Sequence, residues 1–118
     1  MSDARQAVIE VRGLTKKFGG LVAVNQLDFS LRPGQILIPG VISHATNIVE
    51  HPELVAERIV RLAKIVGREN VMGGTDCGFA QSPFARRVHP SIMWAKLKSL
   101  AEGARIATHT LWGKKAAA

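Results

Sequence analysis

The feature that most constrains this fold is a change of hydrophobic period near residue 50. Before it, apolar and polar residues alternate, as in Leu27-Asp28-Phe29-Ser30-Leu31, which is the period of a half-buried strand. After it, apolar residues recur every three or four positions, as they do on one face of an α-helix. A chain that changes period in this way is neither all-helical nor all-strand, so we expect a mixed α/β fold.

The first 37 residues have the character of paired strands. Val8–Arg12 and Leu27–Leu31 alternate cleanly, Val22–Val24 adds further strand, and glycines at positions 13, 19 and 20 interrupt the pattern. Arg32-Pro33-Gly34-Gln35 carries proline and glycine at the positions that a type II turn requires. Residues 1–37 are therefore expected to form a first domain, an antiparallel β-hairpin or meander.

The next segment predicts a strand followed by a helix. Ile36–Ile42 is a continuous apolar run, typical of a parallel strand covered on both faces, and Pro39 removes one donor and makes that strand irregular. Pro52 suits the first turn of a helix and Gly67 its end, so we expect a helix over Pro52–Val66. Its apolar stripe consists of Val55, Ile59, Leu62, Ala63 and Val66.

A second strand and helix complete the pattern. A short strand is expected to begin at Val71, parallel to the one before it, and a helix over Pro90–Trp112. His51 and His89 each precede a helix-opening proline, which indicates a capping role for both. The second helix shows one apolar face made of Met93, Leu97, Leu100, Ala101, Ala104, Ala107 and Leu111. The resulting order is a β-hairpin followed by β-α-β-α.

Composition narrows the class of partners. No apolar run approaches the roughly 20 residues that span a bilayer, so we expect no membrane insertion. The single cysteine excludes an internal disulfide and favours a cytoplasmic location. The net charge of +7 is scattered, with short pairs at Arg86-Arg87 and Lys114-Lys115 and no recognition motif, so we expect no nucleic-acid partner.

The strongest candidate for chemistry is Asp76-Cys77-Gly78, at the end of the strand that begins at Val71. An acid and the only cysteine stand there between glycines, which lets the backbone approach another group closely. Polar residues at the C-terminal ends of strands are where α/β proteins place their active sites. We therefore expect any site to be built around Cys77.

These residues also carry a family resemblance. Gly74-Thr75-Asp76-Cys77-Gly78-Phe79, with the segments from about Ile36 to Trp112, resembles the end of the catalytic domain of the cobalamin-independent methionine synthase family. The resemblance implies that residues 38–118 are the last two β/α units of a TIM-like (β/α)8 barrel. It further implies that Cys77 is a zinc ligand flanked by Asp76 and Gly78, and that the family's partners are a thiol substrate and a methyl donor.

A second resemblance covers the hairpin. Residues 8–37 are similar to the opening of an ABC-transporter ATPase of the branched-chain amino-acid type, with Phe18 at the place of an aromatic that stacks on adenine. The phosphate-binding loop of that class, G-x-x-x-x-G-K-[ST], does not follow: the chain continues Ile38-Pro39-Gly40-Val41. We therefore expect no ATP hydrolysis and no tight binding of Mg²⁺-ATP.

The number of available ligands argues against a zinc site in this chain. A catalytic zinc needs about three protein ligands, and the resemblance supplies only Cys77. His44, His51 and His89 are candidate substitutes without ligand spacing to Cys77. Two arrangements could supply more ligands: His44 and Cys77 should follow strands at the same edge of a sheet, and dimerisation could pair two copies of Cys77. We favour neither, because no group that would orient His44 is evident in the sequence. We therefore expect the chain alone to bind no stoichiometric zinc, to be inactive, and to keep Cys77 as a half-buried thiol.

Three functions stay open on the sequence. The first is that the chain is a relative of zinc-dependent methyl or alkyl transferases acting on a thiol. The second is that it is a nucleotide-binding subunit of an ABC transporter. The third possibility is a non-enzymatic fusion of two partial domains that self-associates through exposed apolar faces. The amount of bound zinc, the affinity for nucleotide and the oligomeric state separate these three.

Overall fold

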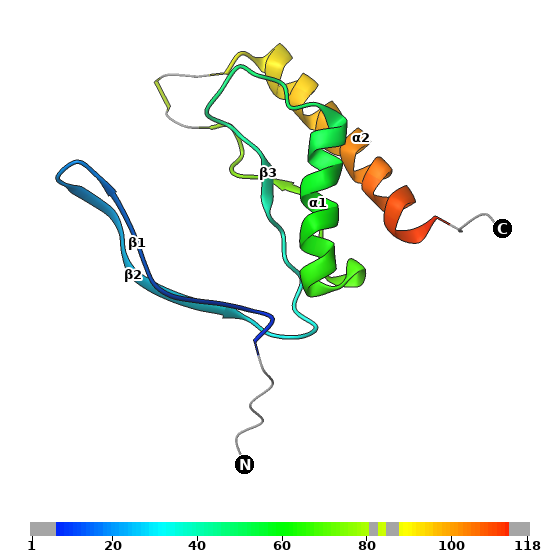
Figure 1. Cartoon of the computed structure of the whole chain (residues 1–118). Coiled ribbons are helices and arrows are strands. Elements are labelled where there is room, and N and C mark those ends of the chain that lie inside the picture. The colour runs from blue at the N-terminus through cyan, green and yellow to red at the C-terminus, as the bar shows by residue number, and fades with distance from the viewer. Residues whose placement is uncertain (1–6, 81–82, 85–87, 114–118) are drawn as a thin grey trace. The chain divides into compact units, whose positions relative to one another are not determined.

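A computed structural model describes residues 7–80, 83–84 and 88–113. The chain divides into two compact units, Met1–Gln35 and Ile36–Ala118 (Figure 1). The first is an antiparallel hairpin and the second adds short parallel strands and two helices, which confirms the mixed α/β class. The Arg86-Arg87 and Lys114-Lys115 pairs lie outside the described residues.

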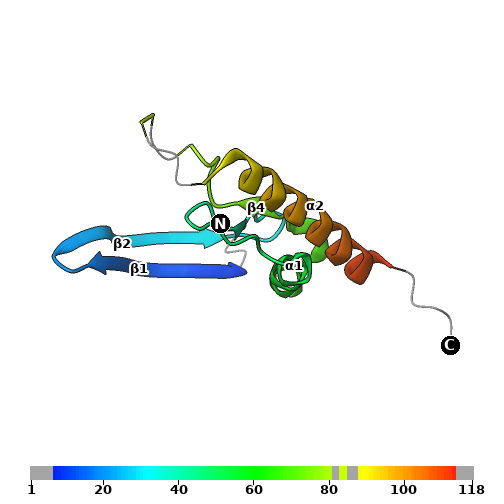
Figure 2. The ribbon, with the colours of Figure 1, turned by 90° about the horizontal axis from the view of Figure 1, so that it is seen from above.

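The first unit is a single hairpin rather than a meander. Strand β1 (Ile9–Phe18) pairs antiparallel with β2 (Leu21–Leu31), so that Ile9 faces Leu31 (Figure 2). Gly19 and Gly20 form the connection, and the φ of 57° at Gly19 lies in the left-handed region that glycine adopts without steric cost. The two strands are longer than the alternating segments that predicted them.

The hairpin extends through Gly13 because the ladder tolerates bulges. Pairing shifts register between Val11 and Lys17, and Gly13 (φ 61°) and Gln26 (φ 48°) lie in this irregular stretch. The N–H of Gln26 donates to Thr15 Oγ1 at 3.0 Å, which replaces a lost ladder bond. Gly13 was expected to interrupt the strand, and instead it supplies the backbone conformation of a bulge.

The turn after the hairpin agrees with its sequence. Gln35 N donates to Arg32 O at 3.2 Å, and Gly34 has a φ of 84°, as the third position of a type II turn requires.

The parallel strands of the second unit are shorter than expected. Strand β3 (Gly40–Ile42) pairs parallel with β4 (Gly74–Thr75), and an isolated bridge joins Leu37 to Val71. Pro39 has no N–H and breaks the run, so the continuous strand predicted over Ile36–Ile42 is wrong in length although right in direction. The Pro39 carbonyl still accepts from Gly74 N at 3.0 Å.

Both helices have the bounds that the sequence predicted. Helix α1 spans Pro52–Val66 and α2 spans Pro90–Trp112, with a short 3₁₀ turn, η1 (Arg68–Asn70), after α1. The capping roles are confirmed: His51 Nδ1 accepts from Glu53 N at 3.3 Å, and His89 Nδ1 from Ser91 N at 3.2 Å.

The core lies between the two helices and one face of the small sheet. A β-carbon at Gly73 would lie 2.8 Å from Ile59 of α1 and 3.3 Å from Leu100 of α2, so both helices cover the same face. The other face carries Ile36, Ile38 and Met72, each more than half exposed. The prediction that these strands are covered on both faces is therefore wrong for the described residues. The central core cluster is Val41, Ile42, Val55, Ala56, Ile59 and Ala107.

The predicted apolar face of α2 is confirmed only in part. Leu100, Ala104 and Ala107 pack in the core, whereas Leu97 and Ala101 are exposed. The buried positions of the helix also include Lys96, Ser99 and Gly103, which the apolar pattern did not predict. Gly103 helps to explain which side of α2 is buried, because a β-carbon there would lie only 2.5 Å from Val55 Cβ. The small residue lets α1 and α2 approach closely, and the helix turns that side inward.

Within the described residues, neither helix is long and apolar enough to cross a membrane.

Candidate functional site

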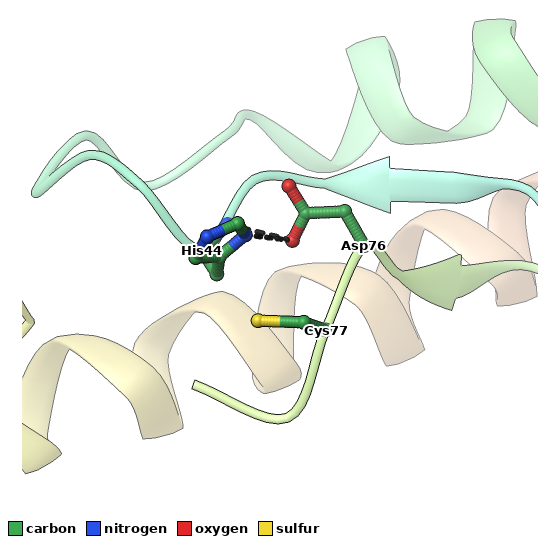
Figure 3. A group of neighbouring side chains, drawn as sticks. All are labelled: His44, Asp76 and Cys77. Carbon is green, nitrogen blue, oxygen red and sulfur yellow. Dashed lines mark hydrogen bonds and ion pairs between the residues drawn. The ribbon is translucent and has the colours of Figure 1, made fainter. Parts of the chain in front are cut away.

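The two loops that follow β3 and β4 meet at one edge of the sheet. His44 comes two residues after β3, and Asp76 and Cys77 come directly after β4. Because the strands are parallel, their C-terminal ends lie together, and the three side chains converge there (Figure 3). The approach of His44 to Cys77, which the sequence analysis did not favour, is therefore the arrangement that the chain adopts.

Asp76 ties the two loops together. Its Oδ1 lies 2.8 Å from His44 Nδ1 and accepts from the His44 backbone N–H, also at 2.8 Å. The Asp76 N–H donates to Ile42 O at 3.0 Å, which continues the ladder of the two strands. One carboxylate thus fixes both the ring and the backbone of His44.

The close approach of the loops depends on Gly40. A β-carbon at that position would lie 2.6 Å from Asp76 Cα and 2.9 Å from Asp76 N, which are backbone atoms that cannot move aside. Any larger residue would push the loop after β4 away from β3. Sequence reasoning noticed the glycines around Cys77 and missed this one.

The three side chains form a group of metal-binding type. One ligand atom from each of His44, Asp76 and Cys77 can be chosen so that all three lie within 4.8 Å of one another. No other group of three such side chains occurs in the described part of the chain. A tetrahedral zinc holds its ligand atoms roughly 3.3 to 3.6 Å apart, so these separations are close to those of a zinc site and small side-chain movements would complete it.

The electrostatics of Asp76 favour a charged carboxylate. Burial acts to raise its pKa, but the hydrogen bonds from the ring and backbone of His44 and from the Cys77 backbone outweigh it. The pKa of Asp76 therefore lies below its ordinary value of 3.8, and the group is ionised at neutral pH. An ionised carboxylate has two oxygens with about four lone-pair sites between them, so Asp76 can bind the ring and backbone of His44 and also contact a cation.

A buried ion pair supports the loop that carries His44. Glu50 Oε1 accepts from Ser43 N at 2.8 Å, and Glu50 Oε2 lies 2.9 Å from Lys96 Nζ of α2. Burial acts to raise the pKa of Glu50, and the hydrogen bonds from Lys96 and Ser43 lower it more, so its pKa falls below the ordinary 4.5. Sequence reasoning missed this pair, because position 96 lies outside the apolar face predicted for this helix and the burial of Lys96 appears only in the structure.

The group does not include the other residues considered from the sequence, Gly78, His51 and His89. Cys77 is half-buried as expected, and Gly78 borders open space, since a β-carbon added there would meet nothing within 4 Å. His51 and His89 cap helices and take no part in the group around Cys77. In the hairpin, the exposed Phe18 ring has Lys16 Nζ 5.1 Å from its centroid, a cation–π contact.

Comparison of the chain with protein-family models, curated proteins and solved structures finds no match to any of them. The site therefore has to be interpreted from its own geometry.

Proposed function

We propose that residues 36–118 bind a zinc ion through His44, Asp76 and Cys77. The observation that supports this proposal is the convergence of one nitrogen, one oxygen and one sulfur ligand from two adjacent loops. Thiolate and imidazole are the ligands that zinc prefers, and carboxylate is a common third. The proposal replaces the expectation of no zinc, because that expectation identified no group to orient His44, whereas Asp76 lies 2.8 Å from its ring nitrogen.

The proposed chemistry is the binding and activation of a thiol. Three protein ligands with an open fourth position are typical of catalytic zinc, whereas structural zinc sites use four. A bound zinc would lower the pKa of a substrate thiol at the open position, so that its proton passes to solvent and the thiolate becomes available for alkylation. This is the chemistry that the methionine synthase resemblance implies.

The chain's own residues have defined parts in this proposal. Cys77 supplies the thiolate ligand and Asp76 a negative charge that offsets the cation. Asp76 also holds the His44 ring in place by accepting from it, as carboxylates do beside metal-binding histidines. The proposal covers metal and thiol binding. It does not extend to alkyl transfer, since no residue has been assigned to a methyl donor.

The test is metal binding by the purified full-length chain. We expect one zinc per chain by elemental analysis after loading and dialysis, and a thiolate-to-metal charge-transfer band when cobalt replaces zinc. Cys77→Ser and His44→Ala should abolish both signals. His109→Ala is the matched control, because His109 is an exposed histidine in the last turn of α2 and lies outside the cluster.

Two results would contradict the proposal. One is the absence of zinc binding in the micromolar range by the folded chain. The other is stoichiometric zinc that persists in Cys77→Ser. Addition of a small thiol such as coenzyme M to the cobalt form then tests the open position, because a thiol that enters it should change the charge-transfer band.

A further inference from the structure

The loop between β3 and α1 carries His44, and the buried Glu50 contacts it at both ends. Glu50 stands at the end of this loop, and its Oε1 accepts from the N–H of Ser43, the neighbour of His44, at 2.8 Å. Both ends of the loop are thereby joined across seven residues through a single carboxylate. The Glu50 carboxylate thus fixes the backbone of Ser43, which precedes His44, while Asp76 holds His44 itself.

Helix α2 fixes the carboxylate from the other side. Lys96 Nζ lies 2.9 Å from Glu50 Oε2 and also donates to the carbonyl of Ile48. One turn further along α2, the Ser99 hydroxyl donates to the Glu50 carbonyl. Two side chains of one helical face therefore hold the side chain and the backbone of the loop end.

The burial of this pair needs an explanation other than stability. The Lys96 side chain is fully buried and that of Glu50 is 9% exposed. Removing two charges from water costs so much that a buried ion pair often stabilises a fold no better than apolar side chains of similar volume. Its directional hydrogen bonds do something that apolar packing cannot, because they set where the loop lies.

We infer that Lys96 and Glu50 are positioning residues for the metal site, acting through Ser43 on His44. The inference rests on the proposed zinc site and adds residues that touch neither the metal nor its ligands. Glu50 keeps the Ser43 N–H in place, Lys96 keeps Glu50 in place, and the imidazole of His44 is thereby held beside Asp76 and Cys77.

The test compares zinc affinity in the full-length chain. Lys96→Met keeps the buried stem and removes the charge, and we expect zinc affinity to fall by about tenfold, as it does when groups that orient metal ligands are lost. Val66→Ala is the control for stability alone, because it removes core methyl groups near the end of α1 distant in sequence from the loop. Zinc affinity in Val66→Ala should stay within about twofold of wild type.

A double variant separates an effect on the position of the His44 loop from an effect on folding stability. Glu50→Leu combined with Lys96→Met removes both charges and should recover stability lost in Lys96→Met. It still leaves the Ser43 N–H without its acceptor, so zinc affinity should remain reduced by about tenfold. Recovery of affinity together with stability would overturn the inference.

A measurement on the metal-free chain keeps the inference separate from the zinc proposal. In Lys96→Met, hydrogen exchange at the Ser43 and His44 amides should accelerate about tenfold more than at the amides of α1. If wild type binds no zinc, the proposed function fails, and this exchange result alone decides the positioning role. Unchanged exchange at His44 would refute that role whether or not zinc binds.

Discussion

The unit with the longer strands is the one without buried side chains among its described residues. The hairpin has strands of 10 and 11 residues, yet none of its described residues is buried. The second unit has strands of 3 and 2 residues, yet it contains every buried residue of the described chain. In the described part of this chain, the longest strands therefore lie where no side chain is buried.

The difference follows from what holds each unit together. Cross-strand hydrogen bonds and two glycine-containing turns define the hairpin, and such bonds exchange for bonds to water at little net gain. An isolated two-stranded hairpin is marginally stable at best. The second unit buries apolar side chains between two helices and a sheet, and burial of apolar surface is the dominant favourable term in folding.

The largest expected effect comes from separating the units. A peptide of residues 1–35 should lose its hairpin in water, whereas residues 36–118 should keep a cooperative unfolding transition close to that of the full chain. Circular dichroism of both pieces and urea titration of the longer one measure this. A well-dispersed amide spectrum from the short peptide, or no transition from the longer piece, would contradict the comparison.

The second-largest effect is expected when a single methyl group is added at a glycine of the second unit. In Gly103→Ala the new β-carbon would meet Val55 Cβ at 2.5 Å and Pro52 O at 2.8 Å. Overpacking costs typically about 1 to 3 kcal/mol or more, and it outweighs the gain of about 1 kcal/mol in helix propensity. We expect a net loss of about 2 kcal/mol in the free energy of unfolding.

Gly20→Ala in the hairpin is the matched control, because nothing lies within 4 Å of a β-carbon there. Its free energy of unfolding should change by less than about 0.5 kcal/mol. Urea titration of both variants makes the comparison, and equal losses would mean that α1 and α2 pack more loosely around Gly103 than the short contacts to Val55 indicate.

Acid should destabilise the second unit through Glu50. Its folded pKa is below 4.5, so the carboxylate stabilises the fold at pH above 4.5, and this contribution is lost as the pH falls through the folded pKa. We expect a smaller change here than in Gly103→Ala. Asp76, whose pKa is also lowered, acts in the same direction. Unfolding free energies between about pH 6 and pH 3 should therefore depend less on pH in Glu50→Gln, and an equal slope would argue against a buried pair.

The smallest effect concerns the helix caps. His89→Ala removes the side-chain acceptor for the Ser91 N–H and should cost about 1 kcal/mol. His109→Ala, at an exposed position of the same helix, should be close to neutral. Thermal unfolding of the two variants tests the difference, and the amide shifts of the hairpin should not change in either.

Much of the local structure was determined by the sequence alone. His51-Pro52 and Gly67 mark the ends of α1, and His89-Pro90 marks the start of α2, because capping and ring geometry act within a few residues. The alternation of Leu27–Leu31 and the Pro33-Gly34 turn likewise predicted paired strands. The order of elements, the bounds of the helices and the parallel direction of β3 and β4 followed from such short-range signals.

Only the tertiary structure decided which side chains meet. The side of α2 that packs inward includes Gly103, which fits closely against Val55, as well as apolar residues of the predicted face such as Ala107. His44 reaches Asp76 and Cys77 because Gly40 lets two loops 32 residues apart in sequence approach, and Lys96 reaches Glu50 across 46. The order of elements placed His44 and Cys77 at one edge of the sheet, but whether their side chains meet depends on how closely one packed element can approach another.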